Sequence, residues 1–231
     1  IYIMVIKKQI VLVSTGTFQK YIKENINQLL KFEFEIHVIV DFPFLKEMDE
    51  YKYSIELIDS TTLQTNFDKK SKLDKKYRDG FWNNASKRLF LVYDYMKMKN
   101  IKNVIHLGDS FDNRKNVDFW ALDWAKEVVY DKLEECKTQV YTIVGNHDVY
   151  FKNTNDINAI DALLTSYKNV KHYSSATEVD IDGFKTLLLP WICQDNYQET
   201  MKTIKDSKSK VAFGHLELNG FALFPGVVQT N

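Results

Sequence analysis

The chain is long enough for one sizeable core or two modest ones, and its composition is ordinary for a globular protein. It has 231 residues, of which 45% are hydrophobic and 14% aromatic. Lys plus Arg and Asp plus Glu each number 31, so the formal net charge is zero. The chain therefore has no net positive charge that would indicate a nucleic-acid partner, and any such contact has to come from a local basic patch.

Cysteine content and hydropathy argue against a secreted or membrane-spanning chain. Cys136 and Cys193 are too few and too scattered for a disulfide framework, which favours a reducing compartment. No segment reaches membrane-spanning length, and the short apolar run at residues 1–6 precedes its lysines, the reverse of a signal peptide. We expect a cytoplasmic location, in a host or viral setting, and no membrane partner. Both ends of the sequence look arbitrary, so we read it as a fragment.

Short runs rich in Val and Ile alternate with longer stretches of helical period. This pattern predicts an α/β fold with a mainly parallel sheet flanked by helices. The predicted strands, in chain order, are Ile10–Ser14, Glu35–Val40, Lys52–Ile58, Asn103–Leu107, Gln139–Val144, Phe184–Leu189 and Lys210–Phe213. The predicted helices are Phe18–Leu30, Asn83–Lys97, Val117–Glu135, Ile157–Tyr167 and Asn196–Asp206. A polar linker is expected at Asp59–Arg78 and a second β layer at Ala176–Leu189.

Three of the predicted strands end in the same way, with an apolar run, then Gly, then residues that can bind a metal ion. These motifs are Gly108-Asp109, Gly145-Asn146-His147-Asp148 and Gly214-His215. The carboxyl ends of parallel strands share one edge of a sheet, so we expect these residues to converge. Gly allows a sharp turn and a close approach to a ligand. Asp, Asn and His offer the oxygen and nitrogen donors that Mn²⁺, Fe²⁺ and Zn²⁺ accept.

The chemistry of each side chain suggests its role. Asp109 can bridge two cations through its carboxylate, Asn146 offers a carbonyl oxygen, and His215 offers an imidazole. His147 can either bind a metal ion or contact a substrate. Asp112 and Asp148 are expected to hold the turns and orient an imidazole.

Each of these residues also has an ordinary explanation. A lone His after a strand is usually a satisfied core or surface residue, and Gly-Asp is a common turn. The combination of the three motifs, in this order, is a much more specific indication of a metal site than any one of them. We assign His106 to a structural role, and His37 and His172 to packing or to the surface.

From about Leu107 to Asn231 the chain resembles the calcineurin-like metallophosphoesterases, and among them the SbcD-type nuclease subunits, which include recombination nuclease subunits of phages. The resemblance is carried by Leu107-Gly108-Asp109-Ser110-Phe111-Asp112, Gly145-Asn146-His147-Asp148, Pro190-Trp191 and Gly214-His215-Leu216-Glu217-Leu218-Asn219-Gly220. It implies a metal-dependent phosphodiester hydrolase, a DNA endonuclease or exonuclease of recombination or repair. Its implied partners are DNA, an SbcC-type ATPase and a second copy in a homodimer.

The same resemblance implies the site. Asp109 would bridge two metals, Asn146 and His215 would bind the second metal, and His147 and Asp148 would serve catalysis, with His147 assisting the leaving group. The implied cofactor is a divalent metal, Mn²⁺ first, with Fe²⁺, Zn²⁺ or Mg²⁺ as alternatives.

Two motifs of the family pattern are missing from the sequence. No Asp-x-His occurs, since the first strand ends Val13-Ser14-Thr15-Gly16-Thr17, and no Gly-His-x-His follows His215. We therefore expect an incomplete site, in which a stable pair of metal ions would lack the donors that offset their mutual repulsion.

The first half resembles a different family. Gly80-Phe81-Trp82-Asn83-Asn84-Ala85-Ser86-Lys87-Arg88 and the run Asn103–Leu107 are similar to a glycosyltransferase of large viruses or marine microbes. The expected domains are thus a glycosyltransferase-like α/β half at residues 1–106 and a partial metallophosphoesterase domain at residues 107–231. One hypothesis is that two unrelated genes are joined near Ile105–Gly108. The alternative function is nucleotide-sugar binding by the first half, with the second half as a non-catalytic passenger. A third reading is an inert fragment.

Overall fold

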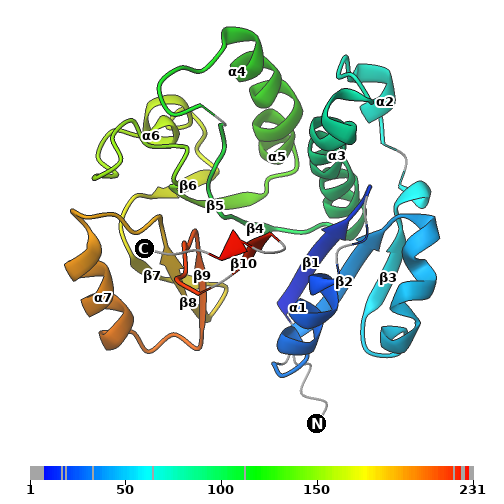
Figure 1. Ribbon diagram of the computed structural model, residues 1–231, viewed down its shortest axis with the longest axis horizontal. Coiled ribbons are helices and arrows are strands. Elements are labelled where there is room, and N and C mark those ends of the chain that lie inside the picture. The colour runs from blue at the N-terminus through cyan, green and yellow to red at the C-terminus, as the bar shows by residue number, and fades with distance from the viewer. Residues whose placement is uncertain are drawn as a thin grey trace. The chain divides into compact units, whose positions relative to one another are not determined.

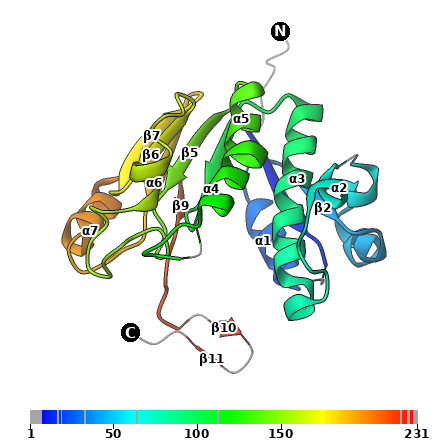
Figure 2. The ribbon, with the colours of Figure 1, turned by 90° about the horizontal axis from the view of Figure 1, so that it is seen from above.

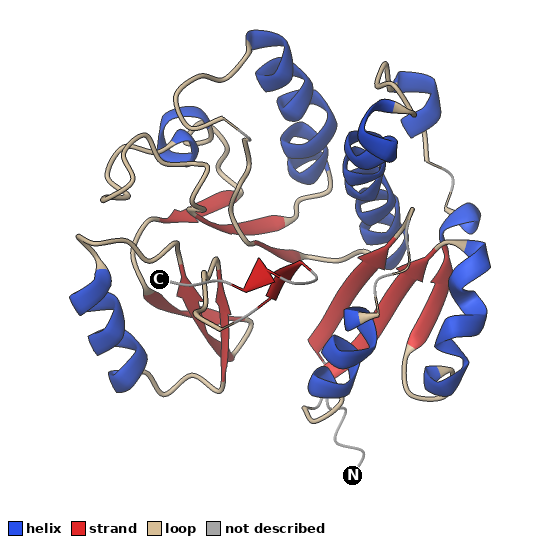
Figure 3. Ribbon diagram, viewed as in Figure 1, coloured by secondary structure: helices blue, strands red, loops and turns tan. Residues whose placement is uncertain are grey.

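The computed structural model describes residues 8–16, 18, 20–32, 34–63, 65–111, 113–220, 222–224 and 227–228. The chain folds as two compact units, Ile1–Asn100 and Ile101–Asn231. Most strand pairs are parallel, and helices lie beside the sheets (Figure 1, Figure 3). The predicted α/β class, with mainly parallel strands, is therefore confirmed. Within the described ranges, no helix combines the length and the hydropathy needed to cross a bilayer.

The first unit is built on a parallel sheet in the order β1-β2-β3. One face of β2 presents Ile36 and Val38 to Ile22 and Ile26 of the amphipathic helix α1. Side chains alternate along a strand, so His37 points to the opposite face, where it contacts Tyr95 of helix α3. The bounds of these elements are β1 Lys8–Ser14, β2 Phe34–Val40, β3 Glu56–Asp59, α1 Tyr21–Leu29 and α3 Phe81–Lys99.

Two predictions for the first unit are wrong in detail. The strand predicted at Lys52–Ile58 begins only at Glu56, because Phe42–Tyr51 form a 3₁₀ helix that has a proline as its second residue and buries Met48 and Tyr51 against the sheet. The predicted linker Asp59–Arg78 is not simply solvated. It contains helix α2 (Phe67–Lys70), and Phe67 is fully buried, with its ring centroid 5.2 Å from that of Phe90.

The second unit packs two small sheets face to face (Figure 2). Tyr141 and Ile143 of one sheet share a core with Ile181 and Leu188 of the other. The second sheet includes the β layer predicted at Ala176–Leu189, which is confirmed, whereas strand β6 was not predicted. The first sheet consists of β4 Asn103–His106, β5 Gln139–Ile143 and β6 Val170–Tyr173, and the second of β7 Thr177–Ile181, β8 Phe184–Leu189 and β9 Val211–Gly214.

Helices and a short hairpin complete the second unit. The predicted helix Val117–Glu135 is present, but it begins where Asp118 caps the backbone N–H groups of Trp120 and Ala121, and a π turn interrupts it. The helix predicted at Ile157–Tyr167 is shorter, since the Asn158 side chain caps its start. The observed bounds are α4 Phe119–Ala125, a π turn Lys126–Tyr130, α5 Asp131–Glu135, α6 Ala159–Leu163, α7 Tyr197–Asp206, β10 Ala222–Phe224 and β11 Val227–Val228.

Candidate metal centre

The loops that follow β4 and β5 touch each other through two glycines. Gly108 and Asp109 both have positive φ, 86° and 55°, so the chain turns sharply at the end of β4. A Cβ atom on Gly108 would lie 2.6 Å from the backbone nitrogen of Gly145, and one on Gly145 would lie 2.3 Å from Asp109 Oδ1. Only glycine allows so close an approach at both positions.

Asp148 holds these two loops together. Its carboxylate is buried, and Oδ2 accepts the backbone N–H groups of Asp109 and Gly145, both at 2.8 Å. Its Oδ1 accepts those of Ser110 at 2.8 Å and Phe111 at 3.4 Å. Burial raises the pKa of Asp148, and the N–H groups of Gly145 and Asp109 act in the opposite direction. This carboxylate therefore positions the loops, which is the turn-holding role expected from the sequence.

His215 reaches the centre from the second sheet. It follows β9, and its backbone N–H donates to the carbonyl of Leu189 at 2.9 Å. Its Nδ1 lies 2.8 Å from the carbonyl oxygen of Leu107. A carbonyl can only accept, so Nδ1 carries a proton, and in the neutral ring Nε2 presents a lone pair. The expectation that all three strands belong to one sheet is wrong, because β9 pairs with β8 rather than with β4 or β5.

The Nε2 atom of His215 lies close to two oxygen atoms. Nε2 lies 2.9 Å from Asn146 Oδ1 and 3.6 Å from Asp109 Oδ2. One carboxylate, one amide oxygen and one imidazole nitrogen thus converge from three loops. With the imidazole proton held on Nδ1, none of these atoms supplies a hydrogen to the others. Such a donor set fits a divalent cation.

His147 lies in the same turn as Asn146. Its backbone N–H donates to Asp109 Oδ1 at 2.8 Å, and the residue is half-buried. The structure thus brings Asp109, Asn146, His147 and Asp148 together beside His215. Asp112, expected to support a turn, lies outside the described residues.

The other histidines of this unit have ordinary surroundings. His106 is half-buried at the end of β4, and its Nδ1 lies 3.1 Å from Thr142 Oγ1. Burial lowers the pKa of His106, Asp109 raises it, and His215 lowers it, so the net shift favours the neutral ring. His172 pairs with Asp161 at 3.3 Å on the surface.

The contacts of Trp191 give the Pro190-Trp191 motif a structural role. Its backbone N–H donates to the carbonyl of Val144, directly before the Gly145 turn. Its indole N–H donates to Glu217 at 3.1 Å, in the segment just after His215. Trp191 therefore ties the two loops of the centre to each other, a role that the sequence alone did not reveal.

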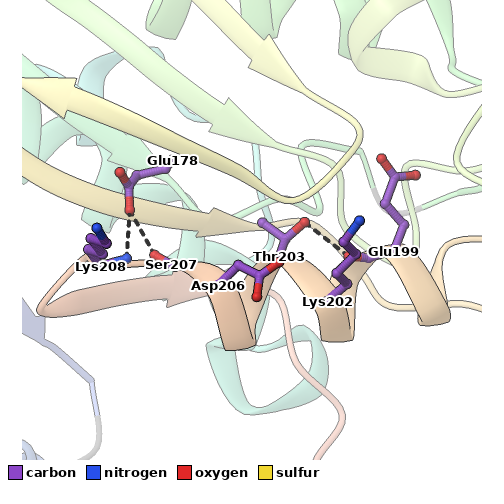
Figure 4. A pocket seen from close by; sticks show the side chains of 7 residues that line it. All are labelled: Glu178, Glu199, Lys202, Thr203, Asp206, Ser207 and Lys208. Atoms are coloured by element: carbon purple, nitrogen blue, oxygen red, sulfur yellow. Dashed lines mark hydrogen bonds between the residues drawn. The ribbon is translucent and has the colours of Figure 1, made fainter.

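A surface pocket along α7 is not part of this centre (Figure 4). Glu178 accepts from the Ser207 hydroxyl at 2.8 Å and from the Lys208 backbone N–H at 3.1 Å. The lining side chains are polar and in part bonded to one another, so the pocket has a structural explanation. Its lining residues are Glu178, Glu199, Lys202, Thr203, Asp206, Ser207 and Lys208.

Comparison with known proteins gives one family match and two relatives. The family model for calcineurin-like phosphoesterases matches residues 44–224. Exonuclease subunit 1 of Enterobacteria phage T4 is 40% identical over 134 residues, which are 58% of this chain and 39% of that protein. The ECF RNA polymerase sigma factor SigX of Bacillus subtilis (strain 168) is 27% identical over 110 residues, 47% of this chain and 57% of that protein. The chain thus spans less than two thirds of either relative.

These matches bear on the two halves of the chain. The glycosyltransferase reading of residues 1–106 has no support, because the phosphoesterase match begins inside them, at residue 44. The match also covers the loops that carry Asp109, Asn146 and His215, together with most of the sequence. This chain belongs to the calcineurin-like phosphoesterase family.

Proposed function

We propose that the chain carries, in residues 107–231, the site of a metal-dependent phosphodiester hydrolase that cuts DNA. The observation that supports this most directly is that Asn146 Oδ1 and Asp109 Oδ2 lie close to His215 Nε2, at 2.9 and 3.6 Å. Family membership supports hydrolysis of a phosphate ester, and the relative named as an exonuclease subunit supports a nucleic-acid substrate.

In this proposal Asp109, Asn146 and His215 hold a divalent cation, with Mn²⁺ as the first choice and Fe²⁺, Zn²⁺ or Mg²⁺ as alternatives. When bound, the cation supplies a Lewis acid for the phosphoryl oxygen. The Leu107 carbonyl keeps the His215 proton away from the cation side of the ring. A single cation is proposed, because one carboxylate does not offset the repulsion between two.

His147 is proposed as the general acid. It lies next to Asn146 in a turn held by Asp109 and Asp148, so its position relative to the ligands is fixed by the backbone. A histidine in this place can donate a proton to the departing oxygen of the phosphodiester. Such a contribution is typically worth about 10²–10⁴-fold in rate.

The test is hydrolysis of bis(p-nitrophenyl) phosphate and of single-stranded DNA with added Mn²⁺. Asp109→Ala should abolish both activities, and His147→Ala should lower them by about 10²–10⁴-fold. His172→Ala, at a surface histidine of β6, is the matched control and should keep full activity. Retained activity in both site variants would refute the proposal. Hydrolysis of the small ester without DNA cleavage would retain the phosphoesterase and reject DNA as the substrate.

We also propose that this chain works as one subunit of a larger assembly. The T4 relative is named as a subunit, and the sequence resemblance implies an SbcC-type ATPase partner and a homodimer. Light scattering on the purified chain measures the dimer directly. Addition of the ATPase should make DNA hydrolysis depend on ATP, while cleavage of the small ester should not depend on it.

A further inference from the structure

The first unit contains a second group of metal-ligating side chains, which has no part in the centre around Asp109. Glu35 and His37 lie on the same face of β2, because side chains two positions apart in a strand point the same way. Glu56 of β3 is the register partner of His37 across the sheet. One donor atom from each of the three lies within 4.8 Å of the others. The strands themselves therefore bring these donors together.

His37 is the central residue of this group and is fully buried. Its Nδ1 contacts the hydroxyl of Tyr95 and lies 3.1 Å from Glu56 Oε2. With the proton on Nδ1, the Tyr95 hydroxyl and the Glu56 carboxylate both act as acceptors on this side of the ring. The other nitrogen, Nε2, then presents a lone pair.

This Nε2 atom is buried and has no hydrogen-bond partner. Glu35 Oε1 lies 3.3 Å from it, but the two are not aligned for a hydrogen bond. Two acceptors at this distance repel each other unless a positive charge lies between them. A metal ion about 2.0–2.2 Å from each ligand atom holds neighbouring ligands about 3.3 Å apart, off the line of a hydrogen bond.

The two glutamates are held in place by their outer oxygens. Glu35 Oε2 accepts from the Gln9 side chain at 3.1 Å, and Glu56 Oε1 pairs with Lys99 at 2.8 Å. The inner oxygens, Glu35 Oε1 and Glu56 Oε2, face His37. Two carboxylates and one ammonium leave one net negative charge to attract a cation. The glutamate side chains are 45% and 40% exposed, which leaves a path from solvent.

We propose that His37 Nε2 and Glu35 Oε1 bind a divalent transition-metal ion, with Zn²⁺ the ion that suits the donors best, and that Glu56 Oε2, which lies 3.1 Å from Nδ1, orients the ring. Imidazole and carboxylate are ordinary Zn²⁺ ligands, and water completes the coordination. The Tyr95 contact fixes the ring from the opposite side, as such contacts do for metal-binding histidines. The ion binds to two residues of β2, and Glu56 of β3 holds the ring in place, so ion binding stabilises the first unit.

The experiment measures zinc in the full chain carrying Asp109→Asn and His215→Gln, which disable the other centre. After dialysis against Zn²⁺ and gel filtration, one equivalent should remain bound. Adding Glu35→Gln should weaken Zn²⁺ binding in titration calorimetry by more than the roughly 10–100-fold that loss of a supporting group costs. The matched control is Glu47→Gln, at an exposed glutamate of the 3₁₀ helix Phe42–Tyr51, which should change nothing.

Replacing the buried His37 risks unfolding, so its ring is followed by ¹⁵N NMR instead. Zn²⁺ should shift the Nε2 resonance and leave Nδ1 protonated. No bound zinc in the disabled chain, or binding unaffected by Glu35→Gln, would overturn the proposal. A ring protonated on both nitrogens and insensitive to Zn²⁺ would also overturn it, and would identify an imidazolium clamped between the two glutamates.

Discussion

Asp109 Oδ2 and His215 Nε2 lie 3.6 Å apart, although Asp109 follows a strand of one sheet and His215 follows a strand of the other. This distance is too long for a hydrogen bond but fits two ligands of one cation about 2.0–2.2 Å from each. The two sheets must therefore be packed together before both ligands are in place. Cation binding and folding of the second unit are linked for this reason.

Mn²⁺ should stabilise the chain against urea, by about 2.7 kcal/mol when its concentration is 100 times the dissociation constant. Asp109→Asn should remove most of this gain, since it removes the carboxylate charge and keeps the shape. Both chains should also carry Glu35→Gln, so that the site proposed in the first unit does not contribute. Equal stabilisation with and without Asp109→Asn would mean that the cation binds elsewhere.

Asp148→Asn should destabilise the chain by about 1–3 kcal/mol and weaken Mn²⁺ binding. The reason is that the new amide group turns N–H donors toward backbone N–H groups, including that of Gly145, which need an acceptor. Urea unfolding and titration calorimetry measure the two effects. Asp156→Asn, at an exposed aspartate of the same unit, is the control and should be close to neutral. A stable Asp148→Asn chain with normal Mn²⁺ affinity would show that the loops keep their geometry without this carboxylate.

Gly145→Ala should disable the centre, because the added Cβ would lie 2.3 Å from Asp109 Oδ1 and 2.4 Å from the Asp109 backbone nitrogen. The Asp109 loop has to move, and overpacking of this kind costs about 1–3 kcal/mol. Gly183→Ala is the control. It lies in the β7–β8 turn with nothing within 4 Å of its Cβ, so it should cause only the strain of its positive φ and leave Mn²⁺ affinity unchanged. The two variants are compared by calorimetry and urea unfolding, and equal Mn²⁺ affinities would contradict the steric argument.

The sequence predicted those parts of the fold that depend on local patterns. Short apolar runs located strands β1, β2, β4, β5, β8 and β9, and the Gly-Asn-His-Asp motif located a turn whose geometry depends on glycine. The short strand β6 was missed, because only Val170 of its four residues is buried and its hydrophobic signal is weak.

Partners that are distant in sequence could not be predicted in the same way. The carbonyl of Leu107 fixes the proton of His215, yet a backbone carbonyl leaves no mark in the amino-acid sequence. His37 was assigned to packing or to the surface, and its burial between Glu35 and Glu56 depends on the register of β2 with β3. Such relationships follow from strand pairing, which a single sequence does not specify.

Glu178 makes the stability of the second unit depend on acid pH. The hydroxyls of Ser209 and Ser207 and the backbone N–H of Lys208 donate to its carboxylate and lower its pKa from 4.5 to about 2. Figure 4 shows the contacts with Ser207 and Lys208. A lowered pKa means that the charged form stabilises the folded state, fully above the unfolded value of 4.5, and that this contribution is lost as the pH falls toward about 2. Glu178→Gln should therefore lower the urea midpoint at neutral pH, and its difference from the unsubstituted chain should shrink between pH 4.5 and about 2. Glu199→Gln, at an exposed glutamate of α7, should show no such change. A difference that stays constant across this pH range would mean that the hydroxyl contacts do not depend on the charge of Glu178.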